Sequence, residues 1–282
     1  MTTLTVPTVV RRDPAPPTTR TLHGLGTLIG RRLSLSAHTP REVVVPLMTP
    51  ILFALVIAPA LAKMVHSTVL DYKTFVAVGT VGLLVPLSCT FAGIGVIVDR
   101  ETGAHRELLA APIRRPLLVV ANMAVALLIS ALQLGALIVA TLVRGAHFHT
   151  RATGVLWFVA AAALFAVTSY AIAEILANRI RKQEEYVGAT PAVAIVPWFL
   201  AGSLFPIRAL PAFLGALTKV LPLTHAMALM RYGLLDGRGT GLHDIWGMSS
   251  APAMAALSLL VVAVWAIVTT AAAIRVFQRS LT

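Results

Sequence analysis

Long apolar segments alternate with shorter polar segments along most of the chain. Six of them are near the ~20 residues that a membrane-spanning helix needs: 43–62, 74–98, 117–143, 155–177, 186–205 and 251–274. Each could cross ~30 Å of hydrocarbon as a helix that rises ~1.5 Å per residue. Their prolines are tolerated in a membrane where neighbouring helices satisfy the freed backbone groups. The pattern predicts an all-α, polytopic membrane protein with six transmembrane helices.

The chain before the first span divides into two parts. Residues 1–19 are rich in Pro and lack an apolar run, so we expect a disordered tail. In residues 20–41, apolar positions recur at three- and four-residue steps: Leu22, Leu25, Leu28, Ile29 and Leu33. This spacing, flanked by Arg31 and Arg32, predicts an amphipathic helix in the membrane interface. The alternative is a plain linker, because three glycines weaken the helix. Residues 42–282 then form the transmembrane domain.

Composition and charge agree with a membrane location. Hydrophobic residues make up 57% of the 282-residue chain and charged residues only 12%, yet the net charge is +12. Such a composition excludes an ordinary soluble domain and a disordered chain. Nucleic-acid binding is disfavoured, because the basic residues lie in short clusters between apolar runs. Membrane lipids are the expected surroundings.

The Lys and Arg residues are unequally divided between the two sides of the predicted membrane. Segments 1–42, 99–116, 178–185 and 275–282 contain 15 of the 23, and the alternate segments contain the other eight. Because cytoplasmic loops carry the excess of positive charge, we expect both termini in the cytoplasm. The Ala-, Val- and Arg-rich composition favours the plasma membrane of a bacterium.

The predicted cytoplasmic loop over residues 99–115 is more than a connection. It reads DRETGAHRELLAAPIRR, in which Glu101, His105, Leu108 and Leu109 fall on one helical face and Pro112 ends the helix. This mixture of acidic, basic and apolar residues predicts a short amphipathic helix that docks into a groove on another protein. The alternative is a solvated surface loop.

The segment 206–235, on the predicted outer side, is apolar but interrupted. Its breaks are Pro206, Pro211, Pro222, Arg208, Lys219 and Arg231. Each unbroken piece is too short to cross, since pieces of about 10–14 residues are more often re-entrant. We expect a pair of short helices that dip into the outer leaflet. The alternative is a seventh span over 209–234, which the charge count disfavours.

Polar residues inside the predicted spans are candidates for the transport pathway. Glu174 lies near the end of the fourth span, where it could contribute to transport or simply reach headgroups or neighbouring side chains. In the third span, Asn122, Ser130 and Gln133 fall within about an 80° arc, so they either line a pathway or bond to another helix. Without a cluster of charges, a lipophilic or weakly polar cargo is favoured.

Two segments resemble the signature regions of type-two ABC transporter permeases, the antibiotic and drug export permeases that include the daunorubicin-resistance type. The first match comprises Asp99, Arg100, Glu101, Gly103, Glu107, Leu108, Leu109 and Pro112. The second comprises Gly202, Phe205, Pro206, Leu210, Pro211, Pro222, Leu223, Thr224 and Arg231. His225 departs from the family pattern, which often has an aromatic residue there.

The resemblance implies half of a transporter. Two six-span permeases, identical or paired with a related chain, would form the pathway, and two cytoplasmic ABC ATPase subunits would drive it. The loop with Asp99, Arg100, Glu101, Gly103, His105, Glu107, Leu108, Leu109 and Pro112 would be the coupling helix seated on the ATPase. The short helices with Phe205, Pro206, Pro211, Pro222 and Thr224 would shape an outer gate.

The chain has no phosphate-binding loop of its own. The pattern G-x-x-x-x-G-K-[ST] is absent from the sequence, and no Gly-Lys pair occurs. We therefore expect no enzyme activity and no cofactor or metal in this chain, with ATP and Mg²⁺ held by the partner ATPase. The alternative is a secondary transporter or channel that works without ATP.

Two histidine patterns could carry other chemistry. His66 and Asp71 form an H-x-x-x-x-D pattern, but no further acyltransferase motif follows it. His147 and His149 could bind a metal, but a third ligand is missing nearby. A membrane enzyme is therefore disfavoured.

Overall fold

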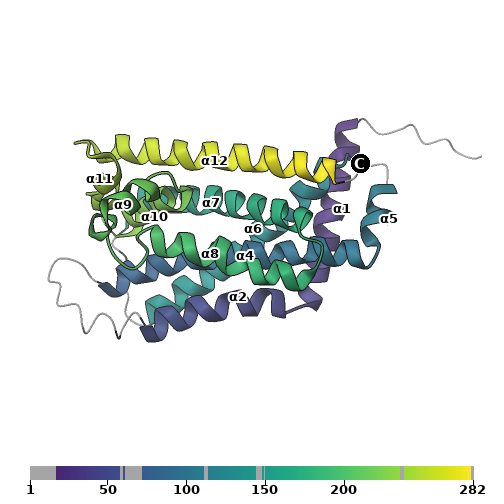
Figure 1. Ribbon diagram of the computed structural model, residues 1–282, viewed down its shortest axis with the longest axis horizontal. Helices are drawn as coiled ribbons and strands as arrows, with labels where there is room; N and C mark the ends of the chain where they lie inside the picture. The colour runs from purple at the N-terminus through teal and green to yellow at the C-terminus, as the bar shows by residue number, and fades with distance from the viewer. Residues whose placement is uncertain are drawn as a thin grey trace, which may run out of the picture.

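A computed structural model describes residues 17–57, 60, 72–110, 114–143, 148, 150–235 and 238–280. Over these ranges every regular element is a helix and no strand occurs, so the all-α prediction is confirmed. The helices run mostly side by side along the long axis of the molecule, and α1 crosses them at one end (Figure 1).

Four helices are long and apolar enough to cross a membrane. They are α4 (Tyr72–Glu101), α6 (Pro116–Val143), α7 (Ala152–Arg179) and α12 (Ala251–Arg279). Each coincides with an apolar segment of the sequence, and α4, α7 and α12 extend a few residues beyond it into a charged last turn. A helix hydrogen-bonds its own backbone N–H and C=O groups, which is necessary in hydrocarbon because no water is there to bond them. The chain is therefore a multi-pass membrane protein.

Two further helices run beside this group but are shorter or less apolar. α2 (Arg41–Leu52) continues into the π-helix η1 (Phe53–Ile57), and α8 (Gln183–Leu200) begins with a charged turn that contains Glu184 and Glu185. Acidic residues favour the start of a helix, where the macrodipole is positive. By length and composition the described part of the chain has four spans, or up to five with one bent helix pair, so six spans stay a prediction.

α4 is the central helix of the molecule. In its most apolar window 83% of the residues are buried inside the molecule, against 28% for α12. It packs against α2, α6, α7 and α8, while α7 also packs against α10 and α12. The side chains of Leu84, Cys89 and Ile97 are completely covered. The outer helices instead expose large apolar side chains, such as Leu132 of α6 and Ile267 of α12. So much exposed apolar surface is unfavourable in water but favourable in contact with lipid chains.

Short helices close one end of the molecule. They are η2 (Ile207–Ala209), α9 (Ala212–Thr218), α10 (Pro222–Leu234) and α11 (Thr240–Trp246). α9 and α10 meet at 82°. A simple seventh span would require one straight helix, so this segment is not such a span. α10 is almost entirely buried against α7 and α12. The expected pair of short helices is therefore present.

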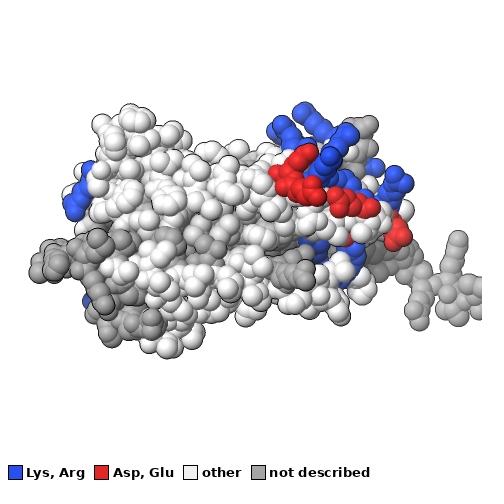
Figure 2. Space-filling view, turned by 60° about the horizontal axis from the view of Figure 1, so that its bottom comes forward, with Lys and Arg blue, Asp and Glu red and all other residues white. Residues whose placement is uncertain are grey.

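Charged side chains gather at the opposite end of the molecule (Figure 2). This end holds α1 (Pro17–His38) and α5 (Ala104–Ala110). They lie where the sequence predicts helices, over residues 20–41 and in the loop after α4. α1 turns Leu28 and Ile29 partly inward and buries Arg32 and Ser36, all on one helical face. Of the predicted tail at 1–19, residues 17–19 belong to α1 and the rest lies outside the described residues.

Candidate functional site

α5 follows α4 after a turn of two residues. Glu101 ends α4, and Thr102 and Gly103 alone separate it from Ala104. Gly103 has a φ of +80°, in the left-handed region that favours glycine. The Thr102 hydroxyl donates a hydrogen bond to the carbonyl of Val98 at 2.8 Å. α5 is thus attached to α4 by a short, closed turn.

One face of α5 rests on the molecule. His105, Leu108 and Leu109 are half-buried. The two leucines pack against a buried apolar cluster at the start of α6 and the end of α12, and the His105 ring meets the Phe277 ring edge-on, with centroids 5.7 Å apart. This face holds α5 in place.

The other face of α5 is open. Arg106, Glu107 and Ala110 are exposed, and so is Glu101 in the preceding turn. The sequence assigned His105 and the two leucines to a partner protein, but the structure turns them toward the helix bundle. A docking partner would instead contact Arg106 and Glu107, since these side chains point away from the bundle.

The environment of His105 favours the neutral form of its imidazole. Partial burial lowers the pKa of His105 from its ordinary value, and the Arg100 guanidinium lowers it further, whereas Asp99 acts in the opposite direction. A neutral ring can pack against Phe277 without the cost of burying a charge.

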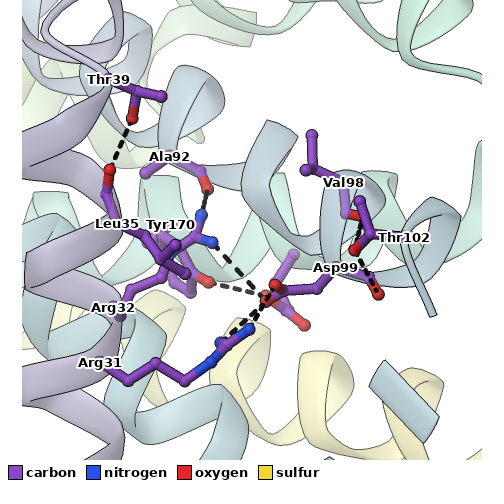
Figure 3. A network of polar contacts seen from close by, with 10 residues as sticks. Arg31, Arg32, Leu35, Thr39, Ala92, Val98, Asp99, Thr102 and Tyr170 are labelled. Atoms are coloured by element: carbon purple, nitrogen blue, oxygen red, sulfur yellow. Dashed lines mark hydrogen bonds and ion pairs between the residues drawn. The ribbon is translucent and has the colours of Figure 1, made fainter. Parts of the chain in front are cut away.

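Asp99, in the last turn of α4, binds two adjacent arginines of α1 (Figure 3). Arg31 places Nη2 at 2.9 Å from Oδ1, and Arg32 places Nη1 at 3.7 Å from Oδ2. Arg32 also donates from Nη2 to the carbonyl of Ala92 at 3.0 Å. The Asp99 and Arg32 side chains are only 11% and 8% exposed. This buried ion pair fixes α1 across α4, and the sequence analysis did not identify it.

The next residue, Arg100, binds the end of α7. Its guanidinium donates to the carbonyls of Ala177 at 3.1 Å and Ile180 at 2.8 Å, where α7 leaves carbonyl groups without helical partners. A cation is favourable there, because the end of a helix carries partial negative charge. Consecutive residues of α4 thus bind α1 and α7.

Glu174 of α7 points into the molecule rather than toward headgroups. It is 1% exposed. Tyr170 donates its hydroxyl to Oε2 at 2.8 Å, and Asn178 donates to Oε1 at 3.0 Å. Both carboxylate oxygens are therefore hydrogen-bonded, as a buried carboxylate requires.

A small cavity of about 20 Å³ lies between α5 and the bundle, which is room for about one water molecule. Its polar lining comprises Arg31, Asp99, His105, Asn122 and Glu174. The structure thus brings together residues that the sequence analysis placed in two separate groups, the coupling loop and the pathway.

The other two pathway candidates lie between helices. Ser130 donates to the hydroxyl of Ser88 on α4 at 3.0 Å, and Gln133 is 1% exposed. Both face the interior of this chain, and Ser130 joins α6 to α4. A role of these two residues in lining a pathway stays a prediction.

The residues proposed for an outer gate mark the starts of the short helices. Pro206 and Pro211 precede η2 and α9, and Pro222 is the first residue of α10. Proline suits these positions, because the first amide groups of a helix have no helical partner. Phe205 is exposed, whereas Thr224 is 1% exposed in α10.

Arg231 joins the short helices to the bundle. Its guanidinium donates to the carbonyls of Gly202 at 2.7 Å and Ser203 at 2.8 Å, and it lies 3.5 Å from the centre of the Phe75 ring on α4. Trp198 donates to the Gly79 carbonyl at 2.7 Å beside it. Two backbone carbonyls and an aromatic face suit the planar, multidentate guanidinium.

His225, the departure from the family pattern, is buried in the same region. Its Nε2 lies 2.8 Å from the Lys219 carbonyl and its Nδ1 lies 3.2 Å from the Ser258 hydroxyl, which accepts a hydrogen bond from Trp246 at 2.8 Å. These contacts connect α10, α11 and α12, so the histidine serves the packing of this end.

Several sequence candidates lie outside the described residues. They are Pro112, His66, Asp71, His147 and His149. Within the part of the chain that the structure describes, no three His, Cys, Asp or Glu side chains are grouped so that they could hold a metal ion.

The comparison with known families agrees with this arrangement. A family model described as the ABC-2 type transporter matches residues 23–235, which include most of α1, all of α5 and the bent pair α9–α10. No curated protein matches the chain. The match spans most of the chain, and permease domains of this family generally work with an ATPase partner. The chain therefore belongs to the ABC-2 type transporter family and is a membrane permease of an ABC transporter.

Proposed function

We propose that this permease is one half of an ATP-driven exporter. Two permease chains, identical or related, form the pathway, and two separate ABC ATPase subunits bind ATP and Mg²⁺ and supply the energy. The chain crosses the plasma membrane six times, with both termini and α5 in the cytoplasm. The observation that carries this proposal is α5, a short helix that packs against the bundle with one face and exposes charged residues on the other.

The exposed face of α5 fits a docking role. Arg106, Glu107 and Glu101 give it both signs of charge, which favours a specific partner surface over a lipid headgroup layer. The helix lies at the charged end of the molecule, which the excess of basic residues assigns to the cytoplasm. α2 and α8 would complete the six spans.

The cargo that this chain favours is lipophilic. Within the described helices, Glu174 and Arg231 are held by neighbouring groups of the same chain, so neither is free to neutralise a charged cargo. The bent pair at the opposite end would form the outer gate, because its short helices interrupt the bundle there.

The docking role is tested by reversing the charge of an exposed residue on α5. We expect Glu107→Lys to lower the recovery of the ATPase that co-purifies with the wild-type permease at least tenfold, because a like charge now faces the partner's complementary surface. Glu185→Lys, exposed at the same end but on α8, is the matched control and should retain the ATPase.

Two outcomes would contradict the proposal. Equal recovery with Glu107→Lys and wild type would remove the docking role from α5. Transport by a wild-type chain that binds no ATPase, driven by an ion gradient, would favour the secondary transporter. Leu108→Asp is a poorer test than its sequence position indicates, because Leu108 packs against the chain's own buried cluster.

A further inference from the structure

The start of α6 and the end of α12 pack against each other at the charged end of the molecule. Leu118 and Val119 of α6 form one buried cluster with Phe277 of α12, and Ile274 packs against it. This contact is named the α6–α12 junction here. Because α6 begins and α12 ends there, the residues just before α6 and in the last turns of α12 lie near the same contact.

Exposed arginines lie on both sides of the α6–α12 junction. Arg114 and Arg115 directly precede α6, and Arg275 directly follows Ile274 in α12. All three arginines are exposed. Within the part of the chain that the structure describes, none of the three guanidinium groups forms an ion pair. They therefore bring positive charge to the junction that no described carboxylate neutralises.

The two helices themselves supply no negative charge. Neither α6 nor α12 contains an acidic residue. The neighbouring α5 contributes Glu107, which is exposed. The turn before α8 differs, because Arg181 and Lys182 lie close in sequence to Glu184 and Glu185. The charge at the junction is thus positive only, which favours an anion from outside the chain.

An exposed apolar stripe of α12 leads to Arg275. At about 100° per residue, Val264, Val268, Ala271 and Arg275 follow one face of the helix. Val264 and Val268 are 50% and 56% exposed. In a membrane-spanning helix such a stripe contacts acyl chains. An amphiphile with an apolar tail and an anionic headgroup matches both parts of this surface.

We propose that the α6–α12 junction binds an anionic phospholipid, with the phosphate at Arg115 and Arg275 and an acyl chain along the exposed stripe of α12. The planar guanidinium group suits phosphate oxygens, which it can bind with two parallel hydrogen bonds. A zwitterionic lipid is disfavoured, because its headgroup brings a cation of its own to the arginines. This lipid site does not rest on the proposed function.

The test uses the full chain, purified in a non-ionic detergent. Binding of phosphatidylglycerol with a fluorophore on one acyl chain is followed by fluorescence anisotropy. We expect unlabelled phosphatidylglycerol to compete at least tenfold better than phosphatidylcholine with the same acyl chains. Arg115→Gln together with Arg275→Gln should weaken the binding of phosphatidylglycerol at least tenfold, because two attractive charges are lost.

Arg181→Gln together with Lys182→Gln is the matched control. It also removes two exposed positive charges from this end, but in the turn before α8, and should change the affinity less than twofold. Arg115→Lys together with Arg275→Lys retains the charge and should retain the preference for phosphatidylglycerol, which separates a loss of charge from a loss of folding. Wild-type affinity in the double Gln variant of Arg115 and Arg275 overturns the site, and so does an equal loss in the control.

Three other outcomes would assign the arginines differently and overturn the proposal. If inorganic phosphate displaces the labelled lipid at the same concentration as phosphatidylglycerol, the site binds a soluble anion. Equal competition by phosphatidylcholine would leave only ordinary lipid-facing surface. If the double Gln variant loses the co-purifying ATPase but binds phosphatidylglycerol as the wild type does, the arginines belong to a protein interface. A chain that binds no ATPase would contradict the proposed function and leave the lipid measurements valid.

Discussion

Three large polar side chains of this permease are tied to backbone carbonyls outside their own helices. Arg100, Arg231 and Trp198 all donate to main-chain oxygens that their own helices do not provide. Such bonds are strong in a low-dielectric interior. Losing the donor is costly, because the buried carbonyl is then left without a hydrogen bond. These three side chains therefore join segments that lie far apart in the sequence.

At this scale we predict that Arg231→Lys weakens the end of the molecule that holds the short helices. Lysine cannot bridge the Gly202 and Ser203 carbonyls while also covering the Phe75 ring. We expect a loss of about 2 kcal/mol in the free energy of unfolding, the size of a hydrogen bond to a charged group. Denaturation in mixed detergent micelles measures it. Arg275→Lys, on an exposed arginine, is the control, and an equal effect of the two changes would contradict the prediction.

At the scale of helices, small residues determine how closely two of them approach. α7 and α10 nearly touch at Gly154 and Gly233, where a Cβ on either glycine would overlap the carbonyl oxygen of the other. Thr150, before α7, also donates to the Gly233 carbonyl at 2.8 Å. Small residues allow such close backbone packing in membrane proteins, and van der Waals contact then stabilises the pair.

We predict that Gly154→Ala separates these two helices. The added methyl group meets backbone rather than a flexible side chain, so the helices must shift, at a cost of about 1–3 kcal/mol. The same denaturation experiment measures it. Gly135→Ala should leave the stability unchanged or raise it slightly. A Gly154→Ala protein as stable as the wild type would show that the helices can separate freely.

For the whole molecule, charge and apolar surface are divided along the long axis. Charged side chains gather at the end with α1 and α5, and the middle is almost free of them on the face shown (Figure 2). Apolar side chains on α6 and α12 face outward in this middle region. This division orients the molecule in a membrane, because each unpaired charge is costly in hydrocarbon.

The orientation is tested with reporter fusions. We expect reporters placed after residues 68 and 148 to appear outside the cytoplasm, and one placed after residue 110 to appear inside. The physical reason is the larger number of Lys and Arg residues in the segments on the α5 side. A cytoplasmic signal at either of the first two positions would contradict the topology.

The faces of the short helices were less predictable than their positions. α5 and α1 lie where periodicity placed them, but the side of α5 with Leu108 turned out to contact α6 and α12. Periodicity identifies an apolar face, yet it does not say whether the chain itself or a partner covers that face. Likewise, Glu174 was recognisable as an unusual intramembrane acid, but its bonds to Tyr170 and Asn178 depend on the packed helix.

The sequence by itself determined the helical class, the positions of the long apolar helices, the breaks in the segment 206–235 and the charged loop after α4. These follow from local hydrophobicity, proline and charge, which act over a few residues along the chain. Only the tertiary structure decided that Asp99 binds Arg31 and Arg32, 68 and 67 positions away, and that Gly95 makes room for this contact. Such pairings depend on which helices pack together, and no local pattern encodes that choice.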